Sequence, residues 1–138
     1  MVSGDIEDLA ELYRQFWDEK SEIENMQNIF KELEDNDHYI QLSALKEGNL
    51  VGSILGIVCE SLYGKCEPFL VIEDFIVDKN YRHQGIGTAL IEELEKRVKQ
   101  KGCSYVILVT EKERKGAISF YESVGFKKGK HQGFKKKI

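Results

Sequence analysis

The segment Tyr81–Ala89 constrains the fold most, because two closely spaced glycines join an apolar, strand-like run to a long amphipathic helix. Gly85 and Gly87 carry no Cβ, so a ligand can approach the backbone closely at this turn. The first N–H groups of the following helix have no intrahelical acceptor, and the helix dipole favours an anion there. The turn therefore predicts a phosphate-binding loop between a strand and a helix.

Composition restricts the class of protein. We expect a single domain over residues 1–138, which is long enough to bury a core without disulfides or metal ions. With 41% hydrophobic and 32% charged residues and no apolar run near the ~20 residues of a membrane span, we expect a soluble protein without a membrane partner. The acidic start of the chain is unlike a signal peptide, so we expect a cytoplasmic location. The three cysteines lack C-x-x-C spacing, which argues against a disulfide and a zinc site.

Charge is distributed unevenly along the chain. Residues 1–37 hold twelve acidic and three basic residues, a net charge of −9, whereas six lysines lie within residues 127–137. Such runs are usually solvated faces, although an acidic end also attracts a cationic substrate. The overall charge of −4, with no recognition motif beside the lysines, argues against nucleic acid as a partner.

Hydrophobic periodicity predicts an ordered series of helices and strands. The predicted elements are helices at 5–19, 21–35, 85–101 and 114–124, strands at 38–45, 50–59 and 69–77, a buried strand at 105–110, and one or two strands in the tail 126–138. A turn at 46–49 joins the first two strands, and Gly125 is placed as a left-handed helix end with Phe126 folding back. The order predicts an α/β (α+β) fold, a mixed β-sheet flanked by helices on both faces.

Two adjacent carboxylates, Glu73 and Asp74, interrupt the apolar run 69–77. Side chains alternate between the two faces of a strand, so one of the pair would enter the interior unless the strand is bulged or splayed there. Strand parity alone does not say which of the two faces a cleft. Both are therefore candidates for a functional role.

The strand at 69–77, the Arg82-x-x-Gly85-x-Gly87 turn, the helix and strand that follow, and the segment Ala117–Phe126 together resemble the GNAT superfamily of acyl-CoA-dependent N-acyltransferases. The resemblance covers residues 69–126 well. A glycine turn alone is weak evidence, but an A-x-x-F-Y-E-x-x-G-F segment about thirty residues later makes the combination specific. Before residue 69 the chain matches the family in element order, with the family's first strand reduced to Met1–Ser3.

The resemblance implies that acetyl-CoA (coenzyme A) is the cosubstrate and that no metal ion is needed. It implies that backbone N–H groups of the loop 82–88 hold the pyrophosphate, that residues 75–77 pair with the pantetheine arm, and that an N–H near Val77 meets the acetyl carbonyl. The cofactor-binding residues expected on this basis are Phe75, Ile76, Val77, Arg82, His83, Gln84, Gly85, Ile86, Gly87 and Thr88. Many members have an asparagine where this chain has Arg114, so that pantetheine contact is not carried over.

Acyl transfer to an amine needs a base, because an amine of pKa ~10.4 is almost fully protonated near pH 7. We expect Glu73 to be that base, directly or through a water, unless it pairs with a basic neighbour or faces solvent. Asp74 is expected to hold the substrate ammonium or to exchange roles with Glu73. The resemblance assigns Tyr121 the reprotonation of the CoA thiolate, a modest contribution because a thiol of pKa ~8.5 is already a fair leaving group; otherwise Tyr121 is a core residue of its helix.

The expected function is transfer of acetyl from acetyl-CoA to a primary amine of a small cationic substrate, which is polyamine-like, aminoglycoside-like or lysine-type. The run Glu73–Val77 is similar to the corresponding strand of the diamine acetyltransferases, where an acidic pair lies at the substrate end of the cleft. One alternative is a non-catalytic acyl-CoA-binding sensor of the same fold. A dinucleotide-binding domain is disfavoured, because Leu90 stands where a third glycine belongs. A homodimer is an expectation by analogy alone.

Overall fold

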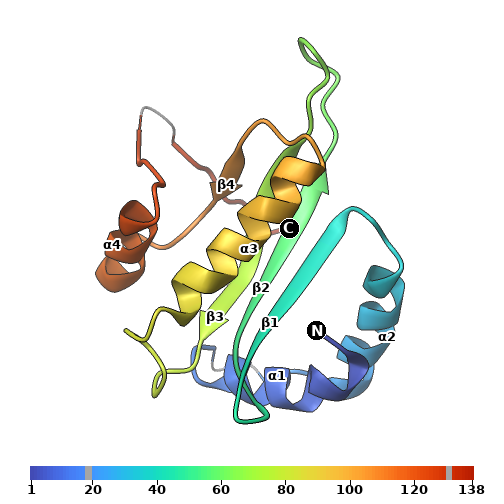
Figure 1. The fold of residues 1–138 in the computed structure, drawn as a ribbon, viewed down its shortest axis with the longest axis vertical. Coiled ribbons are helices and arrows are strands. Elements are labelled where there is room, and N and C mark those ends of the chain that lie inside the picture. Colours follow the sequence, from blue (N-terminus) through green and yellow to red (C-terminus); the bar gives the residue numbers. More distant parts are fainter. Residues whose placement is uncertain (18–19, 130–131) are drawn as a thin grey trace. The chain divides into compact units, whose positions relative to one another are not determined.

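The computed structural model describes residues 1–17, 20–129 and 132–138, which form two compact units, Met1–Ile107 and Leu108–Ile138. The elements are a 3₁₀ turn at Ser3–Asp5, helices α1 (Ile6–Arg14), α2 (Ile23–Glu34), α3 (Ile86–Gln100) and α4 (Lys115–Ser123), and strands β1 (Tyr39–Lys46), β2 (Asn49–Cys59), β3 (Phe69–Val77) and β4 (Val106–Leu108) (Figure 1). In the described residues no helix combines the length and apolar character needed to cross a bilayer.

The sheet has the strand order β1-β2-β3-β4, and β1, β2 and β3 pair antiparallel. Next to β3, Ser104 N donates to Pro68 O at 2.8 Å, and Leu70 N donates to Tyr105 O at 3.0 Å. Residue numbers therefore rise together along both segments, so β4 joins β3 in parallel. The predicted mixed sheet is confirmed.

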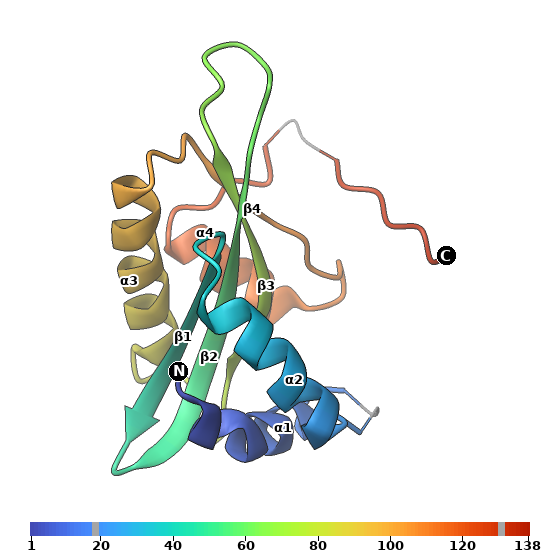
Figure 2. The ribbon, with the colours of Figure 1, turned by 90° about the vertical axis from the view of Figure 1, so that its right-hand side faces the viewer.

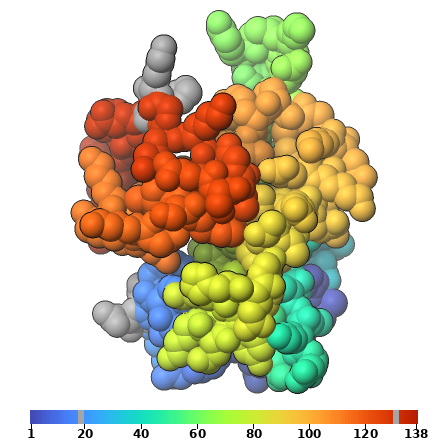
Figure 3. All heavy atoms as spheres, turned by 60° about the vertical axis from the view of Figure 1, so that its left-hand side comes forward, coloured from blue at the N-terminus to red at the C-terminus, as the bar shows by residue number. Residues whose placement is uncertain are grey.

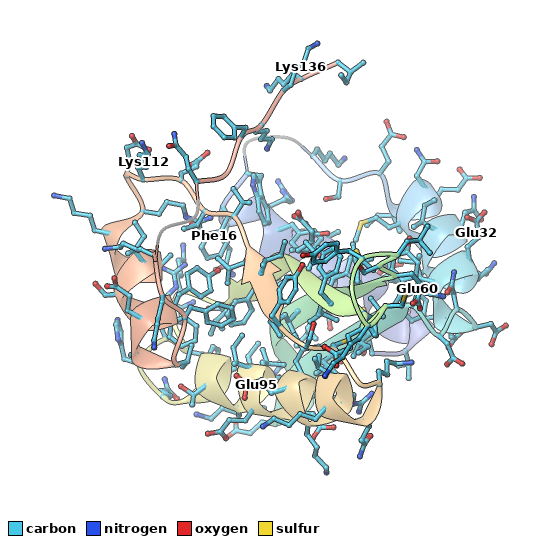
Figure 4. All side chains as sticks on the ribbon, turned by 90° about the horizontal axis from the view of Figure 1, so that it is seen from above. Phe16, Glu32, Glu60, Glu95, Lys112 and Lys136 are labelled. Carbon is cyan, nitrogen blue, oxygen red and sulfur yellow. The ribbon has the colours of Figure 1, made fainter. Side chains whose placement is uncertain are left out.

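Helices cover both faces of the sheet in the first unit, with α3 on one face and α1 and α2 on the other (Figure 2). Glycines let α3 approach β2 closely: a Cβ at Gly56 would lie 2.9 Å from Leu94 Cδ1. On the opposite face a buried cluster joins α1 to the strands through Leu9, Leu12, Leu50 and Ile76. Seen from above, the labelled Glu95 of α3 and Glu32 of α2 lie on opposite sides of the sheet (Figure 4).

A β-bulge in β3 reverses the alternation of its side chains. Leu55 pairs with Glu73 and Ser53 pairs with Ile76, so the two pairs are three residues apart in β3 but two residues apart in β2. Strand β3 therefore contains one extra residue over this stretch. Asp74 lies in the bulge and has a left-handed φ of 50°. Ile72, opposite Gly56, consequently packs on the α3 face, whereas Ile76 joins the cluster on the α1 face. Glu73 and Asp74 both stay exposed, as the bulged alternative predicts.

Several predicted boundaries are confirmed. Strand β3 has the predicted limits, and the β1–β2 turn has left-handed φ angles at Glu47 and Gly48, as a tight hairpin with right-handed strand twist requires.

Helix α1 ends at Arg14 rather than at 19, because the N–H groups of Gln15 and Phe16 bond carbonyls three residues back and tighten the last turn. Residues 18 and 19 of that predicted helix lie outside the described residues.

Two predictions near the C-terminus are wrong. The strand predicted as buried over 105–110 is the three-residue β4, in which Ile107 is 43% exposed, because it is the last strand of the sheet in the described residues. Residues 126–129 and 132–138 contain no strand, since a lysine-rich sequence has little apolar surface to bury. In the second unit, α4 ends as predicted: Gly125 has φ 97°, and Phe126 N donates to Tyr121 O at 3.0 Å.

We expect Gly56→Val to lower the free energy of unfolding by about 1–3 kcal/mol, because the added atoms meet Leu94 and Leu70, which are both almost fully buried. The matched control is Gly4→Ala, since a Cβ at Gly4 has no atom within 4 Å. Urea unfolding of both variants measures the difference. Equal stabilities would show that α3 does not pack closely on β2.

Candidate active site

The β3–α3 loop forms the phosphate-binding turn that the glycines predict. His83 and Gly85 have left-handed φ angles of 60° and 80°, and a Cβ at Gly85 would meet no atom within 4 Å. The first hydrogen bond of α3 runs from Ala89 N to Gly85 O at 2.9 Å. Within the described residues the N–H groups of Gly85, Ile86, Gly87 and Thr88 donate to no protein acceptor. Free amides beside open space suit a diphosphate.

The basic side chains around this loop are held by protein contacts. Arg82 Nε donates to Val77 O at 3.3 Å, and the guanidinium carbon lies 4.6 Å from the centre of the Phe16 ring. Lys46, at the end of β1, donates from Nζ to Gln84 Oε1 at 2.8 Å and lies 5.3 Å from the Tyr81 ring centre. Sequence reasoning missed Lys46, because its partner is 38 residues away in the chain.

The second feature of the site is the acidic pair on the bulge, Glu73 and Asp74. Among residues 1–17, 20–129 and 132–138, neither Glu73 nor Asp74 forms an ion pair or a side-chain hydrogen bond. Asp74 is exposed as a residue, but its carboxyl group is partly shielded from water, and this burial raises its pKa. The adjacent Glu73 carboxylate raises that pKa further. The structural alternative in which Glu73 pairs with a basic neighbour therefore finds no support there.

An aromatic cluster at the end of α1 lies beside the acidic pair. Tyr13 and Trp17 meet edge to face with ring centres 5.3 Å apart, and Phe16 lies 6.2 Å from Trp17. Burial raises the pKa of the Tyr13 phenol, and the negative charge of Asp74 raises it further, so the phenol keeps its proton at neutral pH. Sequence reasoning does not identify Tyr13 and Trp17 as site residues, because their helical spacing predicts only that they face the core.

Tyr121 belongs to the second unit, where it lies on α4 between two other aromatic rings. The centres of the Phe120 and Phe126 rings are 5.6 and 5.9 Å from that of Tyr121. Burial raises the pKa of the Tyr121 phenol and the Arg114 charge lowers it, with burial the larger effect. The phenol is therefore protonated at neutral pH, as a proton donor must be. Its role relative to Glu73 stays a prediction.

No group of three or more His, Cys, Asp or Glu side chains in the described ranges is arranged to hold a metal ion.

Comparison with known proteins assigns the chain to a family. The model of the acetyltransferase (GNAT) family matches residues 6–126. The chain belongs to this family. The GNAT fold extends over the whole chain: a putative acetyltransferase from Agrobacterium tumefaciens str. C58 superposes with a TM-score of 0.90 at 22% identity, covering 100% of this chain and 96% of that one. Membership in the GNAT family removes the dinucleotide-binding alternative.

Two further relatives have named substrates. An aminoglycoside acetyltransferase from an uncultured soil metagenomic sample, solved in complex with trehalose, is 25% identical with a TM-score of 0.82, covering 100% of this chain and 93% of that one. Glucosamine 6-phosphate N-acetyltransferase of Trypanosoma brucei brucei is 41% identical over 61 residues, which is 44% of this chain and 40% of that protein. The chain spans about half or less of the length of the curated relatives it matches.

We expect Asp74→Asn to raise the melting temperature at pH 7. The folded-state pKa of Asp74 lies above its unfolded value, so stability falls as the pH rises from the unfolded pKa to the folded-state pKa, and the full cost remains above it. The gain should stay below about 1 kcal/mol because the residue is exposed and screened. The gain should vanish below the pKa that Asp74 has in the unfolded chain, because Asp74 is then protonated and as neutral as the asparagine. Asparagine also tolerates the left-handed backbone at this position.

A matched variant separates the two causes of the raised Asp74 pKa. Glu73→Gln removes the neighbouring charge, so the pKa of Asp74, followed by carbon NMR titration, should fall. A lower melting temperature for Asp74→Asn, together with an unmoved pKa in Glu73→Gln, would contradict this account of the acidic pair.

Proposed function

We propose that this protein is an N-acetyltransferase that moves the acetyl group of acetyl-CoA to a primary amine of a small cationic substrate. One observation carries the proposal: the bulge in β3 presents two adjacent carboxylates, which form no ion pair within the described residues, on the chain segment that leads into the free amides of the phosphate loop. A candidate cation site in β3 and a candidate anion site at the start of α3 are thus joined by the end of β3 and the loop that follows it. This arrangement suits a reaction that joins a CoA thioester to an amine.

The CoA half of the site uses the backbone. Amides of the loop 82–88 hold the pyrophosphate, and residues Phe75–Val77 pair with the pantetheine arm, as in the family. The N–H near Val77 then donates to the acetyl oxygen, where such a donor is worth ~3–4 kcal/mol in the transition state. Lys46, fixed to Gln84, adds positive charge beside the loop.

The amine half uses the acidic pair together with α1. Burial raises the pKa of Asp74 and repulsion from Glu73 raises it further, and a cation placed beside the two carboxylates would relieve that repulsion. The two relatives named above act, by their names, on an amino sugar phosphate and on aminoglycosides. A substrate phosphate would meet two carboxylates here, so polycationic amines of the aminoglycoside or polyamine type fit this site better.

The proton transfers of the proposed reaction are assigned to these side chains. Glu73, directly or through a water, takes a proton from the substrate ammonium while Asp74 holds the charged end of the substrate. The amine nitrogen attacks the acetyl carbonyl carbon, the carbon–sulfur bond breaks, and the departing thiolate receives a proton from the Tyr121 phenol. The nitrogen loses its second proton as the amide forms, and an equivalent proton, passed directly or through water, restores the Tyr121 phenol. Asp74 exchanges roles with Glu73 if its carboxylate faces the amine.

Release of free thiol from acetyl-CoA with a panel of amines tests the proposal: spermidine, kanamycin, Nα-acetyl-lysine and glucosamine 6-phosphate. We expect turnover with the polycationic amines and little with the phosphate sugar. Glu73→Gln should lower kcat by about 10²–10⁴-fold with CoA affinity unchanged. Glu60→Gln, an exposed glutamate on the β2–β3 hairpin, is the matched control.

A second variant tests the proton donor. Tyr121→Phe should lower kcat about tenfold or less, because the thiolate is already a fair leaving group. The fall should be smaller with an acyl donor whose thiol has a lower pKa. If wild-type protein releases no thiol with any amine while still binding CoA, the catalytic proposal is wrong.

A further inference from the structure

The last turn of α1 is hydrogen-bonded to the start of the phosphate loop. Gln15 Nε2 donates to Asp78 Oδ2 at 2.7 Å, and Gln15 Oε1 accepts from the backbone N–H of Lys79 at 3.1 Å. Both ends of one side-chain amide are therefore used, across 63 and 64 residues of chain.

Asp78 in turn organises the first residues of the loop. Its Oδ1 accepts from Asn80 N at 2.7 Å, and its backbone O accepts from Tyr81 N at 2.9 Å. Its own N–H donates to Val51 O of β2 at 2.9 Å. Burial raises the pKa of Asp78, but the hydrogen bonds from Gln15 and Asn80 together with the charge of Lys79 outweigh burial and lower it, so the carboxylate stays ionised and remains an acceptor. Asp78 thus ties the loop to the sheet and to α1 at once.

The residue after Gln15 makes a second contact with the loop. Phe16 packs under the Arg82 guanidinium at 4.6 Å, in the middle of the loop. On the other side, Lys46 of the β1–β2 hairpin binds Gln84 at 2.8 Å. In the space-filling view, the yellow-green atoms of the loop lie between the blue atoms at the end of α1 and the teal atoms of the hairpin (Figure 3).

We propose that Gln15 is a positioning residue for coenzyme A, which holds the phosphate loop in its binding conformation through Asp78 and Lys79. The proposal rests on the CoA site of the proposed function. The chemistry of the position is specific, because the side chain must donate to a carboxylate and accept from an amide. A neutral amide does both, whereas a carboxylate at position 15 would face the Asp78 carboxylate and an ammonium could not accept.

An exchange of the two groups gives a sharp test. In Gln15→Glu two carboxylates face each other, and in Asp78→Asn two donors meet whichever way the Gln15 amide turns. In the double variant, the glutamate accepts from both the new asparagine amide and Lys79 N–H, while the asparagine oxygen still accepts from Asn80 N. Charge and hydrogen bonds are then restored with the partners interchanged.

Isothermal titration with CoA measures the effect. We expect each single variant to raise the Kd for CoA about five- to tenfold, and the double variant to return it to within about twofold of wild type. KM for acetyl-CoA should follow the Kd, with kcat at saturating acetyl-CoA changed by less than KM. Gln15→Asn, too short to reach both partners, should weaken CoA binding in the same direction.

Glu11→Gln is the matched control, since it removes the Glu11–Arg14 ion pair of 2.9 Å on the same helix without touching the loop. It should leave the CoA Kd unchanged. Melting temperatures of all variants separate an effect on stability from an effect on the loop. Single variants that lower the melting temperature but leave the CoA Kd unchanged would overturn the proposal. A double variant that binds CoA as weakly as the single variants would also overturn it. If wild-type protein binds no CoA, the proposed function fails instead.

Discussion

The extra residue in β3 is the constraint on which the rest of the site depends. Without it Ile72 and Ile76 would lie on one face of the sheet; with it Ile72 packs under α3 and Ile76 packs under α1. A left-handed Asp74 costs roughly 1–2 kcal/mol, and the burial of both isoleucines offsets that cost. Two adjacent carboxylates can then stay at the surface within an otherwise apolar strand. Core packing therefore fixes the position of the acidic pair.

The same core fixes the phosphate loop from its helical side. The position of a Cβ at Gly52 lies 3.1 Å from Leu90 and 3.2 Å from Ile86, the first residue of α3. Close packing on this glycine sets how near the start of α3 lies to the sheet. On its other side the loop is tied to α1 through Gln15. The free amides thus belong to a segment that is held at both ends before any ligand arrives, which lowers the entropic cost of binding.

Much of this arrangement follows from the sequence. Strand β3, the glycine turn and the Gly125 helix end are marked by local chemistry: an apolar β-branched run, residues that tolerate positive φ, and an aromatic residue after the glycine. Family membership and the α+β fold followed from the same motifs. These features depend on neighbours in the chain, so a linear pattern encodes them.

The remaining parts depend on contacts between distant segments. Nothing periodic marks Gln15 as the partner of Asp78, or Lys46 as the partner of Gln84, because polar residues in turns show no pattern that names a partner. The burial of β4 was predicted wrongly, since β-branched residues favour both central and outer strands and only the sheet order separates them. From the sequence, a bulge is one way to place Glu73 and Asp74, beside a splayed strand and an inward-facing carboxylate, and strand parity does not decide among them.

Hydrogen exchange of individual backbone amides, with and without CoA, tests the central claim most directly. The account predicts that CoA slows exchange at residues 84–88 and at 75–77, and leaves the tip of the β2–β3 hairpin unchanged. Adenosine without a diphosphate should not protect residues 84–88. Protection by CoA confined to another part of the chain, or no protection at all, would contradict the account.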